Sequence, residues 1–307
     1  MKKLILFCVA VLTITACKNK NNQTDGGQGR QSSIGLQPER IEIESDLFEK
    51  DNKYASIRIS IQMADEEDDR TPVAHAINLQ LIDEIDREFS SAPYSEDRAI
   101  NAYDGDSDDT EDIMEHYGEK AFRLLTSTSK KDQAIRLETL SEAEADLALQ
   151  QTVQYSHDMD MHKSFESDRI IVFDIDASCY YGGAHPNSST RTLVFDKTDG
   201  SQLTEWFTPQ AAKSLQPQLR KGLIGYFNSL GQFETVTEAN INDCLQIDGT
   251  EIPLPTMSIR PGKNGLTFTY GQYEIACYAS GMPTFTIPYD VVRPYLTEKA
   301  AQLLPTE

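Results

Sequence analysis

The alternation of apolar and polar residues that begins at Tyr54 predicts the first strand and helix. Every second residue is apolar, which is typical of a strand with one buried face: Ile57, Ile59, Ile61 and Met63. The acidic run 65–69 ends this strand as a solvated turn. Thr71 and Pro72 then suit the N-cap and the first position of a helix. A helix is predicted because apolar residues recur at helical spacing: Val73, Ile77, Leu81, Ile82, Ile85 and Phe89.

The central part of the chain is predicted to contain a helix, a strand and a domain boundary. The helix begins near Asp112 and has one apolar face, made by Ile113, Tyr117, Ala121, Leu124 and Leu125. Apolar residues alternate again over 147–155, which predicts a strand there. The stretch 157–162, His-Asp-Met-Asp-Met-His, fits neither periodicity. We therefore expect a boundary within 156–168.

Strand patterns dominate the second half of the chain. Strands are predicted over 170–177, 191–195, 201–206, 266–270, 273–278 and 284–287, with a tight turn at 198–200. Helices are predicted over 215–230 and 290–304. Because strands outnumber helices and do not alternate regularly with them, the pattern favours an α+β fold over a doubly wound α/β sheet. Two domains are expected, over residues 38–160 and 161–307.

Composition removes several classes of protein. The 307 residues include 28 Lys and Arg against 49 Asp and Glu, which gives a formal net charge of −21. Nucleic-acid binding relies on basic side chains that neutralise phosphates, and no run of Lys and Arg occurs beyond the first three residues. A polytopic membrane protein needs several apolar stretches of about 20 residues, and the one candidate, 4–16, is shorter. We therefore expect neither a nucleic-acid partner nor a polytopic membrane protein.

The N-terminus resembles a bacterial lipoprotein signal. Lys2 and Lys3 precede an apolar stretch that ends in Ile-Thr-Ala-Cys at 14–17. The resemblance implies that residues 1–17 are the signal and that Cys17 carries lipid, whose two or three acyl chains hold a protein stably on a membrane. An ordinary secretory signal with a chance cysteine is the alternative. Residues 18–37 are polar and are expected to be a flexible tether.

The residue that follows Cys17 bears on the location within the cell envelope. It is Lys18 rather than Asp, and no acidic run follows it. By resemblance to the rules of lipoprotein sorting, this implies the outer membrane, with the protein facing the periplasm.

Three cysteines are expected in the folded protein. Cys8 leaves with the signal and Cys17 is lipidated, which leaves Cys179, Cys244 and Cys277 in a compartment that permits disulfides. One bridge can then form in three ways, and spacing alone leaves all three open. The absence of any Cys-x-x-Cys argues against a thiol-redox motif and a zinc ribbon.

An acidic stretch offers a calcium-like pattern. Oxygens fall at positions 1, 3, 5, 9 and 12 of a calcium loop: Asp104, Asp106, Asp108, Asp112 and Glu115. Position 6 is Asp109, where a calcium loop needs Gly for a sharp turn. The alternative is a solvated acidic loop that leads into a helix N-terminus, where carboxylates are favoured. No other cofactor is expected, because the metal-ligand types at 157–162 lack a spacing that would converge them.

Motifs of catalysis are absent from the sequence. It contains no Gly-x-Ser-x-Gly, Ser-x-x-Lys or His-Glu-x-x-His, and no phosphate-binding Gly-x-x-x-x-Gly-Lys. Paired carboxylates for glycoside cleavage stay open, because an acidic chain offers many pairs. The absence of every motif favours a protein that is not an enzyme.

The segment 178–186, Ser-Cys-Tyr-Tyr-Gly-Gly-Ala-His-Pro, is the strongest candidate for a site. It follows one apolar strand and precedes another, and its two glycines permit an irregular, closely approached backbone. In a functional interpretation, Tyr180, Tyr181 and His185 line a recognition or catalytic spot. In a structural interpretation, the segment is a corner in which His185 donates a hydrogen bond to a backbone carbonyl.

Two motifs carry a resemblance to a known family. The first is the Tyr-x-Gly-Gly-Ala-His of 180–185, with an Asp-Gly turn and Trp-Phe at 206–207 behind it; the second comprises 265–268, 273–281, 287–289 and 295–296. Together they resemble a bacterial envelope domain of unknown function. This domain occurs in the extracellular region of the lysozyme-sensing anti-sigma factor RsiV and in a non-catalytic region of a peptidoglycan deacetylase. The resemblance covers about 166–300, with departures at Pro186, where Gly is common, and Cys277, where Pro is common.

The resemblance implies a fold and a function. The fold is a small N-terminal α/β domain followed by a C-terminal RsiV-like α+β domain with a mainly antiparallel sheet. The function is binding without catalysis, in an envelope lipoprotein whose ligand is a cell-wall fragment or a protein, including a cationic one such as lysozyme. The implied binding residues are Tyr180, Tyr181, Gly182, Gly183, His185, Tyr273 and Tyr278. The proximity of Cys277 to one motif and Cys179 to the other favours a Cys179–Cys277 bridge.

Two other functions stay open at this point. One is a peptidoglycan- or glycan-acting hydrolase or deacetylase with its site near His185. The other is a calcium-stabilised structural module built on the acidic stretch.

Overall fold

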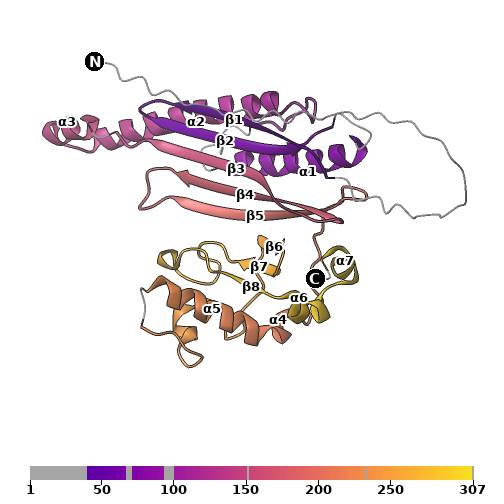
Figure 1. Cartoon of the computed structure of the whole chain (residues 1–307). Helices are drawn as coiled ribbons and strands as arrows, with labels where there is room; N and C mark the ends of the chain where they lie inside the picture. Colours follow the sequence, from indigo (N-terminus) through magenta and orange to yellow (C-terminus); the bar gives the residue numbers. More distant parts are fainter. Residues whose placement is uncertain (1–39, 67–70, 93–99, 151, 232–233, 306–307) are drawn as a thin grey trace, which may run out of the picture. The chain divides into compact units, whose positions relative to one another are not determined.

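A five-stranded sheet separates two layers of the chain (Figure 1). The computed structural model describes residues 40–66, 71–92, 100–150, 152–231 and 234–305. The expected signal, Cys17 and the tether lie outside these residues. The strands lie in the order of the chain: β1 (Ile43–Asp51), β2 (Ala55–Ala64), β3 (Tyr155–Glu166), β4 (Ile170–Tyr180) and β5 (Asn187–Asp196).

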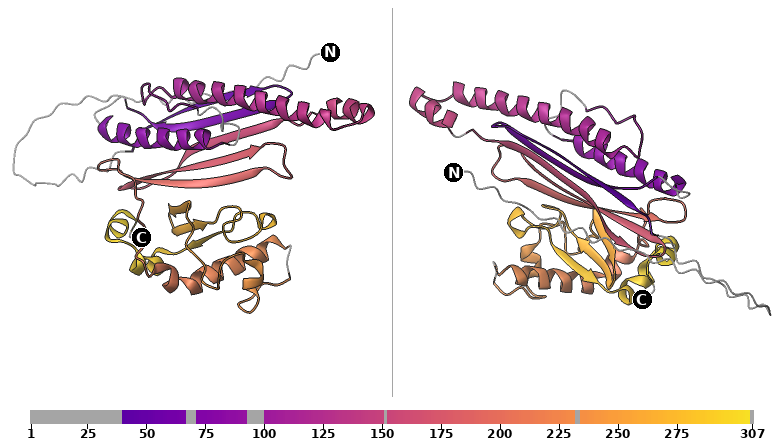
Figure 2. Two further views of the ribbon diagram at one scale, coloured as in Figure 1. Left: turned by 180° about the vertical axis from the view of Figure 1, so that it is seen from behind. Right: turned by 45° about the horizontal axis from the view of Figure 1, so that its top comes forward.

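Helices between β2 and β3 cover one face of this sheet. All neighbouring strands are antiparallel except β2 and β3, which are parallel and therefore need a crossover connection. The crossover consists of α1 (Thr71–Ser90), α2 (Thr110–Glu138) and α3 (Glu142–Gln150). Both views in Figure 2 show α1 and α2 lying along the sheet.

The described residues that follow β5 pack on the opposite face. It contains a three-stranded antiparallel sheet of β6 (Ser258–Gly262), β7 (Gly265–Thr269) and β8 (Thr284–Ile287). Its helices are α4 (Ala211–Ser214), α5 (Gln216–Leu230), α6 (Tyr289–Val292) and α7 (Glu298–Leu303), and its 3₁₀ turns are η2 (Ile241–Cys244), η3 (Tyr278–Ser280) and η4 (Arg293–Tyr295). The mixed architecture confirms the α+β class that the sequence favours.

Strands β4 and β5 are buried on both faces. Successive side chains of a strand point to opposite faces, so Phe173 and Ile175 join the core under α1 and α2, whereas Val172 joins the core around α5 and the small sheet. Val194 of β5 likewise faces the second core, and Phe195 faces the first. One pair of strands therefore holds together both layers.

The shared strands concern the two domains that the sequence predicts, over residues 38–160 and 161–307. Position 160 lies inside β3, and the first core includes side chains of β4 and β5. The described residues between 40 and 305 belong to one compact unit.

Several predicted elements are confirmed within a residue or two. They are the strand from Tyr54, the helices that begin at Thr71, near Asp112 and near Leu215, and the strand at 284–287. The strand predicted over 170–177 is also present and runs on to Tyr180. The alternating apolar residues of the strand from Tyr54, Ile57, Ile59, Ile61 and Met63, are all buried, as predicted.

Four predicted elements are wrong. Residues 201–206 form no strand, and within this stretch only Gln202 makes an isolated bridge, to Phe195. Residues 147–150, predicted to begin a strand, belong to the helix α3. This helix starts at a capping box in which the Glu144 carboxylate accepts hydrogen bonds from the Ser141 N–H and hydroxyl. Residues 157–162 lie within β3 instead of breaking the pattern. Residues 273–278 form a turn, since Tyr273 has a positive φ of 63° that no strand accommodates.

The last predicted helix is split in two. Pro294 stands in a 3₁₀ turn, Leu296 is extended, and Thr297 caps a new helix by accepting a hydrogen bond from the Ala300 N–H. No helix in the described parts of the chain is both long and apolar enough to span a membrane.

Two glycines of α5 provide a matched test of how the helix packs. A Cβ on Gly222 would lie 2.2–2.6 Å from the Phe285 ring, which is held by a stack on Phe268 with centroids 5.9 Å apart. A Cβ on Gly225 would meet nothing within 4 Å. We expect Gly222→Ala to destabilise the protein by about 1–2 kcal/mol through overpacking. Gly225→Ala should stabilise it by about 0.5–1 kcal/mol through helix propensity. Urea unfolding midpoints that move in the same direction for both variants would contradict this packing.

Candidate functional site

The two sequence motifs meet in the structure. The loop 181–186 follows β4, and the turn 271–278 follows β7. The Ser188 N–H donates to the Gln272 side-chain oxygen at 3.0 Å, and the Tyr278 hydroxyl donates to the Pro186 carbonyl at 2.9 Å. Two segments about ninety residues apart along the chain are thus in contact.

An aromatic group lies at this junction. The His185 ring stacks on Tyr278, with centroids 3.6 Å apart and an interplanar angle of 19°. The Tyr273 hydroxyl lies 3.3 Å from His185 Nε2, and its ring lies 6.0 Å from that of Tyr278. We call His185, Tyr273 and Tyr278 the aromatic surface. Tyr273 is 56% exposed, so this group faces solvent.

Hydrogen bonds define the tautomer of His185. Nδ1 lies 3.0 Å from the Pro186 carbonyl, which can only accept, so Nδ1 carries a proton. In the neutral ring, Nε2 is then an acceptor and receives the Tyr273 hydroxyl. The structural interpretation of His185, as a donor to a backbone carbonyl, is therefore correct, and it coexists with an exposed aromatic group.

The backbone at Tyr273 is strained. Among the described residues it is the only one other than glycine with a positive φ. The Glu274 carboxylate holds the turn by accepting from the Gly271 N–H at 2.7 Å and from the Thr256 N–H at 2.9 Å. A conformation that costs about 1–2 kcal/mol is thus maintained by neighbouring contacts, as is common at functional sites.

This strain predicts an unusual order of stability. Tyr273→Ala and Tyr273→Gly both remove the ring, but only glycine adopts the positive φ without strain. We expect Tyr273→Gly to be more stable than Tyr273→Ala by about 1 kcal/mol, the reverse of the usual order. Thermal unfolding of the two variants measures the difference. An alanine variant as stable as the glycine variant would show that the turn is not strained.

The other residues of the first motif have different environments. The Tyr180 hydroxyl donates to the Gly183 carbonyl at 3.0 Å and so closes the loop. Gly182 has a φ of 80°, and a Cβ there would meet the Tyr155 ring at 2.9 Å. Tyr181 packs against Tyr155 at the edge of the first core, with centroids 6.2 Å apart. Tyr181 therefore belongs to the core rather than to the aromatic surface.

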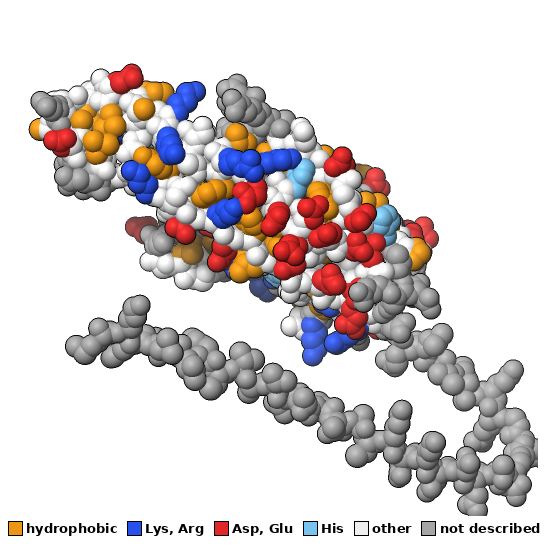
Figure 3. All heavy atoms as spheres, turned by 90° about the horizontal axis from the view of Figure 1, so that it is seen from above, with side chains coloured by type: hydrophobic (Ala, Val, Ile, Leu, Met, Phe, Trp, Pro, Cys, Tyr) orange, Lys and Arg blue, Asp and Glu red, His pale blue; other side chains and the backbone are white. Residues whose placement is uncertain are grey.

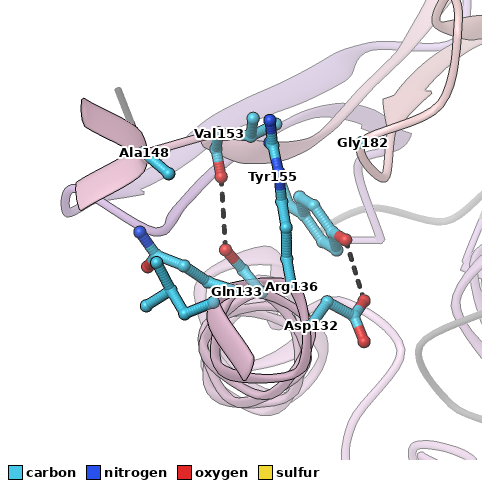
Figure 4. A pocket seen from close by; sticks show the side chains of 9 residues that line it. Asp132, Gln133, Arg136, Ala148, Val153, Tyr155 and Gly182 are labelled. Atoms are coloured by element: carbon cyan, nitrogen blue, oxygen red, sulfur yellow. Dashed lines mark hydrogen bonds between the residues drawn. The ribbon is translucent and has the colours of Figure 1, made fainter. Parts of the chain in front are cut away.

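A small cavity of about 110 Å³ lies beside Gly182 (Figure 4). It is bounded by the C-terminal half of α2, by α3 and by the start of β3, and Arg136 and Gln133 line it. The Tyr155 hydroxyl donates to Asp132 at 2.8 Å, and burial and this hydrogen bond raise the pKa of Tyr155 to about 12. The phenol therefore stays protonated and links α2 to β3.

A second concave feature is a groove of about 960 Å³ between β5, the segment 202–209 and the segment 254–259. Trp206, the single tryptophan of the chain, lines it together with Arg191 and the exposed Met257. The single tryptophan is the feature of the sequence that could have pointed to this groove.

The three described cysteines are free thiols, so the expected Cys179–Cys277 bridge is not present. Cys179 lies on β4 beside Tyr181, near the charge of Glu88, whereas Cys277 lies in the turn that carries Tyr278. Burial raises the pKa of the Cys179 thiol, which opposes a nucleophilic role.

The acidic stretch caps α2. Asp109 accepts a hydrogen bond from the Asp112 N–H at 2.9 Å, as an N-cap does, and Asp112 in turn accepts from the Tyr103 hydroxyl at 2.9 Å. No group of three or more His, Cys, Asp or Glu side chains in the described ranges is arranged to hold a metal ion. The arrangement is that of an acidic loop at a helix N-terminus.

Charge is unevenly distributed over the face that carries α2 (Figure 3). Acidic side chains gather around its N-terminal part, and basic side chains gather toward its C-terminal part. Within α2, Glu111 and Asp112 lie in the first turn and Arg136 lies in the last turn. This order of charges favours the helix dipole.

Sequence reasoning missed a buried ionic network between α1 and the sheet. His157 is 1% exposed, and its Nε2 lies 3.1 Å from a Glu88 carboxylate oxygen. Arg191 donates to the other oxygen of Glu88 at 2.9 Å and contacts Glu84 more loosely at 3.4 Å. Burial acts to raise the pKa of Glu88, but the hydrogen bond and charge of His157 and the charge of Arg191 outweigh it, so the pKa is lowered. The ion pairs therefore keep Glu88 ionised inside the protein.

These features describe an α+β protein whose candidate site is an exposed aromatic surface at the junction of two motifs. Residues 232–290, which include Tyr273 and Tyr278, match the family model DUF3298, described as a protein of unknown function. None of the curated proteins compared with the chain matches it.

Two solved structures share the fold. One is a member of the DUF3298 family from Bacteroides fragilis, 17% identical, with a TM-score of 0.59 over 88% of this chain and 100% of that one. The other is a DUF3298 family protein from Pseudomonas aeruginosa, 12% identical, with a TM-score of 0.52 over 88% of this chain and 99% of that one. At these identities the likeness extends to the fold.

Proposed function

We propose that this chain is a non-catalytic lipoprotein of the bacterial cell envelope that binds a protein or cell-wall ligand through the aromatic surface. The observation that carries the proposal is the convergence of His185, Tyr273 and Tyr278 from two distant segments. Aromatic side chains are favoured at binding surfaces because a rigid ring buries a large area at a low entropic cost.

The orientation of the rings supports recognition. His185 and Tyr278 are fixed by bonds to the same Pro186 carbonyl, and Tyr273 is fixed by its strained turn. A surface that is ordered before binding loses less entropy when a ligand arrives.

The contacts of His185 support binding over catalysis. A general base needs a free nitrogen directed at its substrate, and usually a third group that orients the ring. Both ring nitrogens of His185 are engaged, and their partners in the described chain are a backbone carbonyl and a tyrosine.

Charge supports a cationic protein as the ligand. The net charge of −21 accelerates encounter with a positively charged partner, and the resemblance to the lysozyme-binding region of RsiV points to a lysozyme-like one. A peptidoglycan fragment is the cell-wall alternative.

The location in the envelope follows from the N-terminal motif. The proposal requires lipid on Cys17 and an outer-membrane position facing the periplasm. Mass spectrometry of the mature N-terminal peptide tests it: a diacylglyceryl cysteine supports the lipoprotein, and an unmodified Cys17 refutes it.

Two assays separate binding from catalysis. Immobilised protein should retain lysozyme saturably at about 150 mM salt, where retention through general acidity is screened. Incubation with muropeptides should leave them unchanged. Turnover that disappears in His185→Ala, with folding unchanged, would instead identify a wall-acting enzyme.

A further inference from the structure

Two of the three free thiols lie on segments that pair with each other. Cys244 ends η2, and the chain then becomes extended at Leu245. The next residue, Gln246, donates its backbone N–H to the Ile275 carbonyl at 2.8 Å. Cys277 follows Ile275 by two residues, just as Cys244 precedes Gln246 by two.

This hydrogen bond holds the segment that follows Cys244 against the segment that precedes Cys277, so each cysteine lies two residues from the same contact. The charge of Cys277 contributes to raising the pKa of Cys244, which agrees with this proximity.

The third cysteine is in a different environment. Cys179 lies on β4, where its register partner is His157, and it contacts Tyr181 at the first core. Cys244, by contrast, packs against the second core. Cys244 and the residues beside Cys277 therefore belong to the second core, whereas Cys179 lies at the first.

The two thiols of this pair differ in reactivity. The hydroxyl of Ser280 lies 3.5 Å from the Cys277 sulfur, and this hydrogen bond lowers the pKa of Cys277. Burial, together with the charges of Asp243 and Cys277, raises the pKa of Cys244. Since the thiolate is the nucleophile, Cys277 is the thiol that reacts first.

We propose that Cys244 and Cys277 are a disulfide-forming pair, oxidised by exchange with a disulfide donor. The Cys277 thiolate attacks the donor disulfide, forms a mixed disulfide and releases one donor thiolate. The Cys244 thiolate then attacks the Cys277 sulfur, and the second donor thiolate leaves. The two protons lost by the chain are taken up by the two donor thiolates, so the chain is oxidised by two electrons and the donor is reduced by two.

The bridge would fasten the turn of the aromatic surface. It ties η2 to the segment 271–278, which otherwise depends on hydrogen bonds such as those of Glu274. A bond of this kind restricts the unfolded chain and holds the turn in place. The inference concerns the thiols alone and holds whether or not the aromatic surface binds a ligand.

Peptide mapping tests the pairing. The reduced full chain is treated with oxidised glutathione, its remaining thiols are alkylated, and it is digested without reduction for mass spectrometry. We expect a linked peptide that contains Cys244 and Cys277, lighter than the two free peptides by two hydrogen atoms, with Cys179 alkylated. A link that includes Cys179, or recovery of Cys244 and Cys277 as unlinked peptides, would overturn the proposal.

Variants give an independent measurement. Cys179→Ser should still form the link and should show the same rise in Tm on oxidation as the unsubstituted chain. Cys244→Ser and Cys277→Ser should form no link and should show no rise in Tm on oxidation. A rise in Tm that survives in Cys244→Ser would contradict the pairing.

Discussion

Glu88→Gln is expected to destabilise the protein by about 3 kcal/mol, because removing one charge from a buried ion pair leaves its partners uncompensated. Glu88 bridges His157 and Arg191, and His157 is almost completely buried. Chemical denaturation at neutral pH measures the loss. A destabilisation below about 1 kcal/mol would show that the network is solvated like a surface pair.

The same network predicts a dependence on pH. The pKa of Glu88 is lower in the folded protein than its ordinary value of 4.5. Its contribution to stability is therefore fully present above that ordinary value and is lost as the pH falls through the lower folded pKa. The stability difference between the unsubstituted chain and Glu88→Gln should shrink over this acidic range.

An exposed ion pair provides the control. Arg58 and Glu49 lie 3.1 Å apart on neighbouring strands, with their side chains 47% and 58% exposed. Glu49→Gln should change the stability by less than about 1 kcal/mol at neutral pH. If it costs as much as Glu88→Gln, burial is not the cause of the larger effect.

Tyr278→Ala is expected to weaken ligand binding about tenfold or more, while the protein stays folded. Tyr278 is the centre of the aromatic surface, because it stacks on His185 and lies beside Tyr273. Central aromatic residues of an interface commonly contribute about 2 kcal/mol or more, which exceeds a tenfold change in Kd. His185→Ala should have a similar effect, since it removes the other half of the stack.

Leu47→Ala is the matched control for this loss. Leu47 is an exposed apolar residue, 52% accessible, on β1 at the opposite edge of the five-stranded sheet from β5. The substitution removes apolar surface without changing the aromatic surface, so the Kd should stay within about twofold of that of the unsubstituted chain. Equal losses in Leu47→Ala and Tyr278→Ala would indicate nonspecific hydrophobic binding.

Local signals account for the elements that the sequence predicted well. The helix from Thr71 has an unbroken apolar period, and β2 has a strict alternation. The helix α3 had its own signal in the Ser141–Glu144 capping box, which the alternation of apolar residues beyond 147 outweighed.

The strand β3 was not predicted because one position on its buried face is occupied by an ionisable residue, His157. Tyr155, His157, Met159 and Met161 are all buried on one face. His157 fits that series because its Nε2 lies 3.1 Å from a Glu88 carboxylate oxygen, and Glu88 is 69 positions away along the chain. No local pattern reveals such a network, since it depends on how α1 packs on the sheet.

The candidate site was predictable as a pair of motifs but not as a geometry. The sequence indicated that His185, Tyr273 and Tyr278 belong together, and the structure brings them into contact. It did not reveal that Tyr181 faces the core, because that depends on the positive φ of Gly182 and on the position of Tyr155. The resemblance therefore grouped residues that the fold separates.

The central claim is that the aromatic surface binds the ligand. Calorimetric titration at about 150 mM salt, with lysozyme and separately with purified muropeptides, tests it most directly because general charge attraction is screened there. The account predicts saturable binding of one of the two, lost in Tyr278→Ala and retained in Leu47→Ala. No saturable binding of either ligand, or equal binding by Tyr278→Ala and the unsubstituted chain, would contradict it.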